Sequence, residues 1–257
     1  MLSAWEAILL GLLQGLTEFL PVSSSGHLVI AQHFLGIEQP MLAFDIAVHL
    51  GTLAAVIAAF WGDVKALLKK PFCKTTLLLI TGTIPAVAAA LLLEDHIDAM
   101  FSSMTAVAMA LIFTGILLQN SDNFRGRGRM EDMSQKNALI VGLFQAAAIV
   151  PGLSRSGATI FGSLFGGLDR AQAARFSFLL SIPVILGAAC KQLLNMRHTA
   201  EFSLHWTYLL GAAVAALAGY AAIRIFLKLL GKRSLRYFGY YCWALAALVT
   251  VAGLLGR

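Results

Sequence analysis

The sequence predicts an all-α polytopic membrane protein with two inverted-topology repeats, each a re-entrant helical hairpin followed by three transmembrane helices. Hydrophobic residues make up 59% of the 257 positions and charged residues only 12%, whereas soluble domains carry about 25% charged residues. Two long apolar stretches are interrupted by polar segments that match each other, and the cations gather in alternate loops. We therefore interpret residues 1–257 as a single membrane domain, with one repeat at about 1–125 and the other at about 130–257.

Six uninterrupted stretches have the length and composition of membrane crossings, which take roughly 20 apolar residues. They are 42–61, 75–94, 100–119, 174–190, 206–226 and 237–256. Trp61 and Trp206 stand at the ends of two of them, where tryptophan anchors a helix at the membrane interface.

Two further apolar stretches are broken in the middle. Residues 3–37 are interrupted by Pro21–His27, and residues 137–168 are interrupted by Pro151–Gly157. A polar break that contains proline and glycine, between two short apolar arms, favours a re-entrant hairpin. Such backbone is tolerated at membrane depth only where protein buries it or where it lines a wet cavity.

The two broken stretches are repeats of each other. A shift of 131 positions, without a gap, places Gln14 on Gln145 and pairs Ser24 with Arg155. The same shift aligns Ser23 with Ser154, Ser25 with Ser156 and Gly26 with Gly157. Since three crossings follow each hairpin, the second half is predicted to be inverted, so that the two tips meet near the midplane. Inverted repeats with broken helices place a binding site at the repeat interface.

Charge predicts the orientation. The net charge of +6 sits largely in three short loops, at about 62–74, 121–136 and 227–236, so we expect contact with membrane lipids and no nucleic-acid partner. These loops contain Lys65, Lys69, Lys70, Lys74, Arg125, Arg127, Arg129, Lys136, Lys228, Lys232, Arg233 and Arg236. The opposite loops hold mainly Lys191 and Arg197. The positive-inside rule makes the basic side cytoplasmic, and both chain ends are then expected to face outward.

The first break carries a set of side chains suited to phosphate chemistry: Gln14, Thr17, Glu18, Ser23, Ser24, Ser25 and His27. Gln14 and Glu18 are four residues apart and share one helix face, where their oxygens can hold Mg²⁺ or Ca²⁺ together with phosphate and water. Ser24 can attack phosphorus with His27 as general base. Attack by His27 itself or by an activated water is also compatible with these residues, and the serines can instead cap the following helix.

The second break reads Pro-Gly-Leu-Ser-Arg-Ser-Gly-Ala-Thr over residues 151–159. The Arg155 guanidinium can bind phosphate oxygens bidentately, and the following helix start adds backbone amides. Ser154, Ser156 and Thr159 are the accompanying candidate binding residues. The structural alternative is that Arg155 pairs with a carboxylate such as Glu18. Asp45 and His49, one turn apart in an apolar stretch, are interpreted as a bonded structural pair.

At these two breaks the sequence resembles the undecaprenyl-diphosphatase family, also called bacitracin-resistance proteins. The matching segments are Gln14–His27 and Pro151–Thr159, and weaker similarity covers essentially the whole chain. Many family members have Glu where this chain has Gln14, although the family pattern also admits Gln. Glu18, Ser24, His27 and Arg155 occupy the positions of the family's functional residues.

The resemblance implies a bacterial inner-membrane enzyme that converts undecaprenyl diphosphate to the monophosphate and so recycles the carrier for peptidoglycan and other envelope polymers. It also implies a divalent cation, an active site that opens to the periplasmic side, and a homodimer. A polyprenyl-phosphate translocase, with or without hydrolysis, is the alternative, because inverted repeats with re-entrant tips are also typical of transporters. A small-anion channel is disfavoured because no continuous polar lining is evident.

Overall fold

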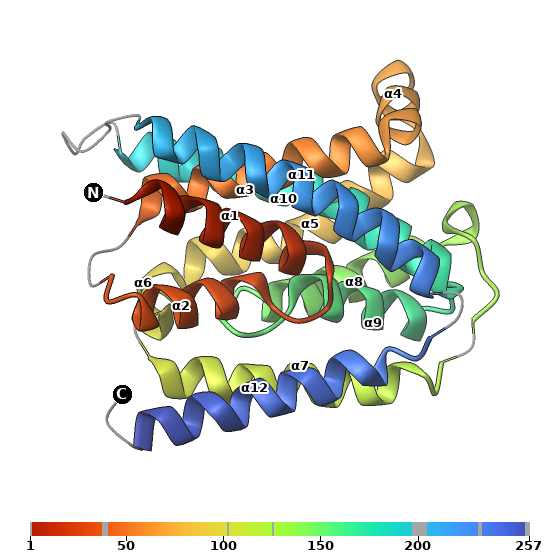
Figure 1. Cartoon of the computed structure of the whole chain (residues 1–257). Helices are drawn as coiled ribbons and strands as arrows, with labels where there is room; N and C mark the ends of the chain where they lie inside the picture. The colour runs from red at the N-terminus through yellow and green to blue at the C-terminus, as the bar shows by residue number, and fades with distance from the viewer. Residues whose placement is uncertain are drawn as a thin grey trace.

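The computed structural model describes residues 2–37, 41–101, 103–124, 126–196, 205–230 and 233–254. The regular elements of this part are helices, with one isolated β-bridge between Gly128 and Leu168. The helices lie roughly side by side in one bundle (Figure 1), which confirms the all-α prediction. Arg125, Arg197, Lys232, the outer limits of both predicted repeats and the end of the stretch 237–256 lie outside the described residues.

The helices follow the predicted stretches closely. They are α1 Ala4–Phe19, α2 Ser24–Phe34, α3 Leu42–Ala59, α4 Trp61–Lys69, α5 Lys74–Leu92, α6 Glu94–Phe101, α7 Met104–Ser121, the 3₁₀ turn η1 Met130–Asp132, α8 Gln135–Ala147, α9 Arg155–Phe165, α10 Arg170–Met196, α11 Trp206–Leu230 and α12 Arg236–Leu254. Among the described residues, α3, α5, α7, α10 and α11 are long and apolar enough to cross a membrane. The chain is therefore a multi-pass membrane protein. The sixth predicted crossing falls on α12, which is not one of these five and has Arg236 and three tyrosines in its first two turns.

Each broken stretch forms a pair of short helices that turns back inside the bundle. The pair α1–α2 begins at the end of the bundle where both chain ends lie, and the pair α8–α9 begins at the opposite end (Figure 1). Each turn coincides with a predicted polar break, because proline and the serine caps end one helix and start the next. The division of the whole chain into two inverted repeats stays a prediction.

Each hairpin packs mainly against a long helix from the other half of the chain. Helix α1 lies along α11, and α8 lies along α5. Gly11 faces the backbone of Gly211, and Gly142 faces the carbonyl of Gly82, so closely that an added Cβ would collide in either place. Since lipid supplies no hydrophobic driving force between helices, close backbone approach of this kind contributes to holding them together.

Gly11→Ala should lower the thermal stability of the purified protein, although alanine is the better helix former by about 1 kcal/mol. The new methyl group meets the Gly211 backbone, and overpacking of this kind costs about 1–3 kcal/mol. Gly187→Ala is the matched control, because Gly187 lies in α10 with open space around it. A melting temperature that is equal or higher for Gly11→Ala would contradict close packing of α1 on α11.

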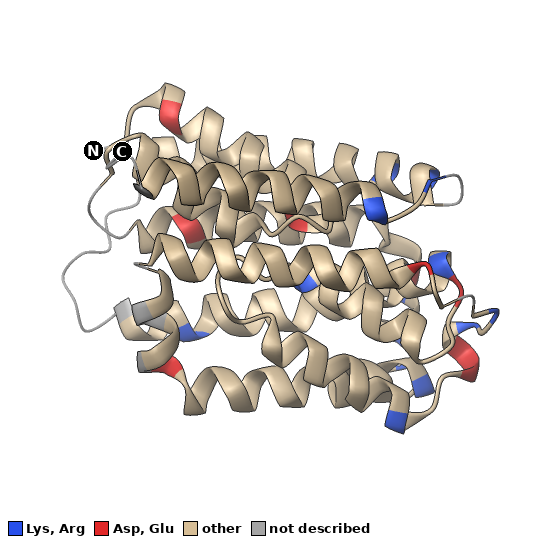
Figure 2. Ribbon diagram, turned by 90° about the horizontal axis from the view of Figure 1, so that it is seen from below, with Lys and Arg blue, Asp and Glu red and all other residues tan. Residues whose placement is uncertain are grey.

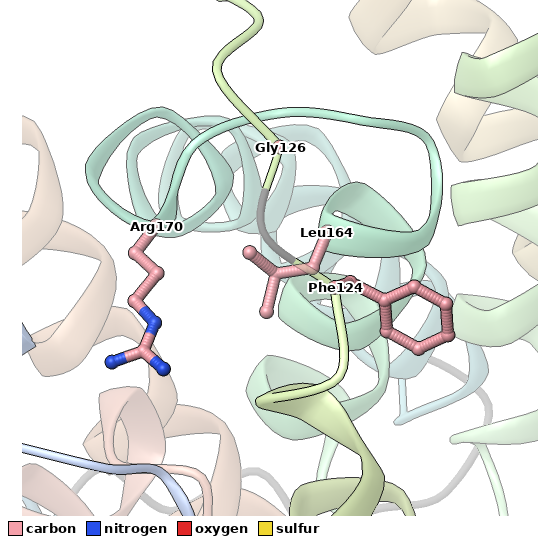
Figure 3. Close-up of a pocket in the computed structure, with 4 residues that line it drawn as sticks. All are labelled: Phe124, Gly126, Leu164 and Arg170. Atoms are coloured by element: carbon pink, nitrogen blue, oxygen red, sulfur yellow. The ribbon is translucent and has the colours of Figure 1, made fainter.

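The cations gather at the end of the bundle opposite the two chain ends (Figure 2). There Asp122 binds Arg170 and Ser234, and Asp63 binds Arg175. A pocket of about 350 Å³ lies at the same end, with Arg170 on one side and Phe124 and Leu164 on the other (Figure 3). Leu164 stands nine residues after Arg155 on α9, about 14 Å along the helix, so this pocket is distinct from the site at the tips.

Candidate functional site

The two hairpin tips are built in the same way. The Ser23 hydroxyl accepts the backbone N–H of Gly26 at 3.2 Å, and the Ser154 hydroxyl accepts that of Gly157 at 3.0 Å. These serines therefore act as helix N-caps, which for Ser23 is the structural alternative that the sequence offered. The helices that they cap, α2 and α9, begin with Ser24 and Arg155, which places these two side chains at matching positions.

The two tips are in contact with each other. The Ser156 hydroxyl donates to the carbonyl of Leu20 at 2.9 Å, and the backbone N–H of Gly152 donates to the Ser25 hydroxyl at 3.4 Å. A Cβ on Gly26 would stand 3.1 Å from the Gly152 Cα. Ser25 and Ser156 thus join the tips, and the first residues of α2 and α9 are held close to the end of α1.

The Glu18 carboxylate, only 6% exposed, is the point on which the site converges. Its Oε1 accepts Arg155 Nη2 at 2.5 Å, and its Oε2 accepts the Ser24 hydroxyl at 2.6 Å and Gln14 Nε2 at 2.8 Å. The next residue, Phe19, is fully buried with its ring edge-on to Phe178 at 5.4 Å, which fixes the end of α1. Four predicted site residues from α1, α2 and α9 are therefore brought together around one carboxylate.

Two buried atoms of this cluster have no hydrogen-bond partner in the described part of the chain, namely Gln14 Oε1 and Arg155 Nη1. Leaving a buried polar atom unpaired costs about 1–3 kcal/mol, so each of these two atoms gains stability when it binds a ligand. An amide oxygen beside a carboxylate suits a hard cation, and a free guanidinium N–H suits an oxyanion. The donor set therefore fits both a divalent cation and a phosphate group.

Both ring nitrogens of His27 bond groups other than the Ser24 hydroxyl. Its Nδ1 lies 2.7 Å from the carbonyl oxygen of Ser23, and its Nε2 lies 2.7 Å from the hydroxyl of Tyr241. Because a carbonyl can only accept, Nδ1 carries a proton, and in the neutral imidazole Nε2 then accepts from Tyr241. The expected proton transfer from Ser24 to His27 thus has no direct hydrogen bond in this structure, and the Ser24 hydroxyl points to Glu18 instead.

The predicted binding residues Thr17 and Thr159 use their hydroxyls within the protein. Thr17 donates to the carbonyl of Leu13 at 2.7 Å. Thr159 bonds the carbonyl of Arg155 at 2.8 Å and the hydroxyl of Ser177 at 2.6 Å. Contact of these two threonines with a substrate stays a prediction, as it does for the tip serines Ser23, Ser25, Ser154 and Ser156.

His49 borders the site more closely than the sequence suggested. Its Nε2 lies 3.8 Å from Glu18 Oε2, while its Nδ1 bonds the backbone carbonyl of Asp45 at 2.7 Å. The Asp45 carboxylate accepts Gln32 Nε2 instead. The predicted Asp45–His49 pair exists, but through the backbone, which leaves the other histidine nitrogen toward Glu18. The sequence signal for a role of His49 was an ionisable residue within an apolar span. Nothing in the local sequence around Tyr241 indicates its contact with His27.

The similarity to known proteins extends over all residues of this site. The family profile described as "Bacitracin resistance protein BacA" matches residues 7–248, which include both hairpin tips. The chain belongs to this family. BacA family membership confirms the resemblance seen at the two breaks.

Relatives that carry the name undecaprenyl-diphosphatase match this BacA family chain along nearly their full length. The protein from Halothermothrix orenii is 43% identical, over 96% of this chain and 97% of its own. The protein from Rubrobacter xylanophilus is 44% identical, over 99% of this chain and all of its own. The protein from Carboxydothermus hydrogenoformans is 40% identical over the full length of both.

Proposed function

We propose that this BacA family protein is an undecaprenyl-diphosphatase that cleaves undecaprenyl diphosphate into undecaprenyl phosphate and inorganic phosphate. The observation that carries the proposal is the pair of groups on Glu18: a serine hydroxyl and an arginine with a free N–H, both held by one buried carboxylate. This reaction returns the lipid carrier to the synthesis of peptidoglycan and envelope polymers, and accounts for bacitracin resistance as the family trait.

Arg155 and the hairpin tips bind the diphosphate in this proposal, while the lipid tail lies among the apolar helices. Arg155 Nη1 donates to an oxygen of the terminal phosphate, and Nη2 stays on Glu18. The positively polarised start of α9 adds backbone amides next to the same phosphate. Phosphoryl transfer depends mainly on positioning and on neutralising charge, and these groups supply both.

Ser24 is the nucleophile in the first step. A bond forms between Ser24 Oγ and the terminal phosphorus, the bridging P–O bond breaks, and undecaprenyl phosphate leaves. The serine proton passes along the 2.6 Å hydrogen bond to Glu18 Oε2, which takes over the base role expected of His27. Water then attacks the phosphoserine, the bond between Ser24 Oγ and phosphorus breaks, and inorganic phosphate departs. Glu18 returns the proton to Ser24 Oγ, which restores the hydroxyl.

Glu18 and Gln14 Oε1 are the proposed ligands of a Mg²⁺ or Ca²⁺ ion, which would add neutralisation of the phosphate oxygens. No group of three or more His, Cys, Asp or Glu side chains suited to a metal occurs within the described ranges. A site with oxygens from two protein residues suits the coordination preference of Mg²⁺, which usually takes one or two protein ligands and completes its shell with phosphate and water.

The proposed orientation places the basic end in the cytoplasm, so that α1–α2 enters from the periplasmic side of the bacterial inner membrane and the site opens there. A homodimer is proposed from the family resemblance. Cysteine accessibility at either end of the bundle in intact cells tests the orientation, and the mass of the detergent-solubilised particle tests the dimer.

Purified protein in detergent should release phosphate from undecaprenyl diphosphate, and EDTA should abolish the release. Detergent removes compartments, so translocation alone gives no signal.

Gln14→Leu should raise the Mg²⁺ concentration for half-maximal activity by roughly tenfold, and Gln14→Glu should lower it, since ligand number and charge set affinity. No release from folded protein with either metal would contradict the phosphatase; release that EDTA leaves intact would contradict the cation.

A further inference from the structure

Helix α12 holds the tip of the first hairpin at two adjacent positions. The Tyr241 hydroxyl lies 2.7 Å from His27 Nε2, and Cys242 Sγ lies 3.8 Å from the carbonyl oxygen of Pro21. The rings of Tyr241 and His27 are parallel to within 1°, with their centroids 5.6 Å apart. Helix α12 otherwise packs along α7, so these contacts link a distant element to the first tip.

Ser23 has a strained backbone. Its φ of 70° is the one positive value at a residue other than glycine in the described part of the chain. Such a conformation costs on the order of 1–3 kcal/mol and persists only where its surroundings enforce it. The Ser23 carbonyl accepts two hydrogen bonds from the same residue, one from the backbone N–H of His27 at 3.1 Å and one from His27 Nδ1 at 2.7 Å.

The strained residue directly precedes the proposed nucleophile. Ser23 turns the chain so that α2 begins at Ser24 and the Ser24 hydroxyl reaches Glu18 at 2.6 Å. Relaxing Ser23 to a negative φ would rotate the peptide that leads into Ser24 and withdraw that hydroxyl. The bonds that hold the Ser23 carbonyl therefore also aim Ser24.

We propose that Tyr241 is a positioning residue that acts through His27 to hold Ser23 in its strained conformation and so aims Ser24 at Glu18. Tyr241 donates to Nε2, which keeps the proton of His27 on Nδ1, where it bonds the Ser23 carbonyl. His27 then works as a brace and needs no change of protonation during the reaction. This inference rests on the proposed phosphatase function and adds Tyr241 to its machinery.

Tyr241→Phe removes the hydroxyl and keeps the ring. In detergent its kcat for phosphate release should fall by about tenfold to a hundredfold, as a small misplacement of a reacting group does, while KM changes less than twofold and the pH profile of kcat keeps its shape. Tyr240→Phe is the matched control, because Tyr240 is also exposed on α12 and its ring faces Trp243. An unchanged kcat for Tyr241→Phe overturns the proposal, and so does a displaced limb of the pH profile, which would mean that His27 exchanges protons.

Two substitutions of His27 distinguish a positioning role of this side chain from an acid–base role. Asparagine places its amide nitrogen near the position of Nδ1 and can still donate to the Ser23 carbonyl, whereas the longer glutamine side chain places its amide near Nε2. The proposal expects His27→Asn to retain at least about tenfold more activity than His27→Gln. Equal and complete loss in both variants would overturn it, because neither amide can transfer a proton.

The histidine tautomer gives a readout that does not require activity. In ¹⁵N-histidine-labelled protein, His27, assigned by the loss of its signals in His27→Asn, should show a protonated Nδ1 and a hydrogen-bonded, unprotonated Nε2. Tyr241→Phe should shift the Nε2 resonance, and Tyr240→Phe should not. An Nε2–H tautomer in the wild type would overturn the proposed positioning role of Tyr241 and His27 even if phosphate release is intact. Absent release with the expected tautomer would overturn the proposed function alone.

Discussion

Ser24→Ala is expected to lower kcat for phosphate release by about a thousandfold or more, because it removes the attacking oxygen. Ser24 is half-buried, and its hydroxyl bonds Glu18, so the variant should fold and still bind the diphosphate. With substrate labelled in the terminal phosphate, acid quenching of the wild type should leave label on a peptide that contains Ser24. The measurement is burst and steady-state phosphate release, combined with peptide mapping.

Ser134→Ala is the matched control for that experiment. Ser134 caps α8 by accepting the N–H of Asn137 at 3.1 Å, so it tests the loss of a capping hydroxyl outside the site, at a cost of about 1 kcal/mol in stability. Its activity should stay close to that of the wild type. Activity of Ser24→Ala within tenfold of the wild type, with no labelled peptide, would point to direct attack by water, the alternative compatible with the same sequence motif.

Arg155→Ala is expected to reduce kcat/KM by about 10³-fold or more, the range found for arginines that neutralise a transferring phosphoryl group. Arg155→Lys should restore little of it. One ammonium group cannot serve Glu18 and a phosphate oxygen in the forked manner of Nη2 and Nη1. The measurement is initial rates of phosphate release over a range of undecaprenyl diphosphate concentrations.

Arg155→Ala also leaves Glu18 buried without its cation, and breaking a buried pair costs about 3–5 kcal/mol. The melting temperature must therefore be measured beside the rates. The double variant Glu18→Gln/Arg155→Ala, which removes both charges, should regain stability without regaining activity. Arg175→Ala is the control, because Arg175 pairs with Asp63 at the basic end of the bundle. Retained activity in a folded Arg155→Ala protein would contradict the role given to the guanidinium.

A glutamine at position 14 is consistent with the geometry around Glu18. A second carboxylate at position 14 would stand against Glu18 Oε2, where the Gln14 amide now donates at 2.8 Å. The amide satisfies Glu18 and keeps an oxygen free for a cation. The proposed chemistry therefore uses Glu18 as its one carboxylate.

The sequence by itself determined the parts of this protein that depend on local pattern. Hydrophobic length located the crossings, since the bilayer thickness sets the length of a spanning helix. The Pro/Gly breaks located both turns, and the spacing of Gln14 and Glu18 placed them on one face of α1, where they bond. The motifs at the two breaks are sufficient to identify the family.

Only the tertiary structure decided which side chains meet. Arg155 stands 137 residues from Glu18, and Tyr241 stands 214 residues from His27; no periodicity reports contacts over such separations. His27 followed the serines so closely in sequence that it was expected to be their base. In the structure the ring nitrogens of His27 instead bond the Ser23 carbonyl and Tyr241, and the Ser24 hydroxyl bonds Glu18. A helical period describes one face of one element, whereas the partner of a buried polar atom is chosen by the packing of all of them.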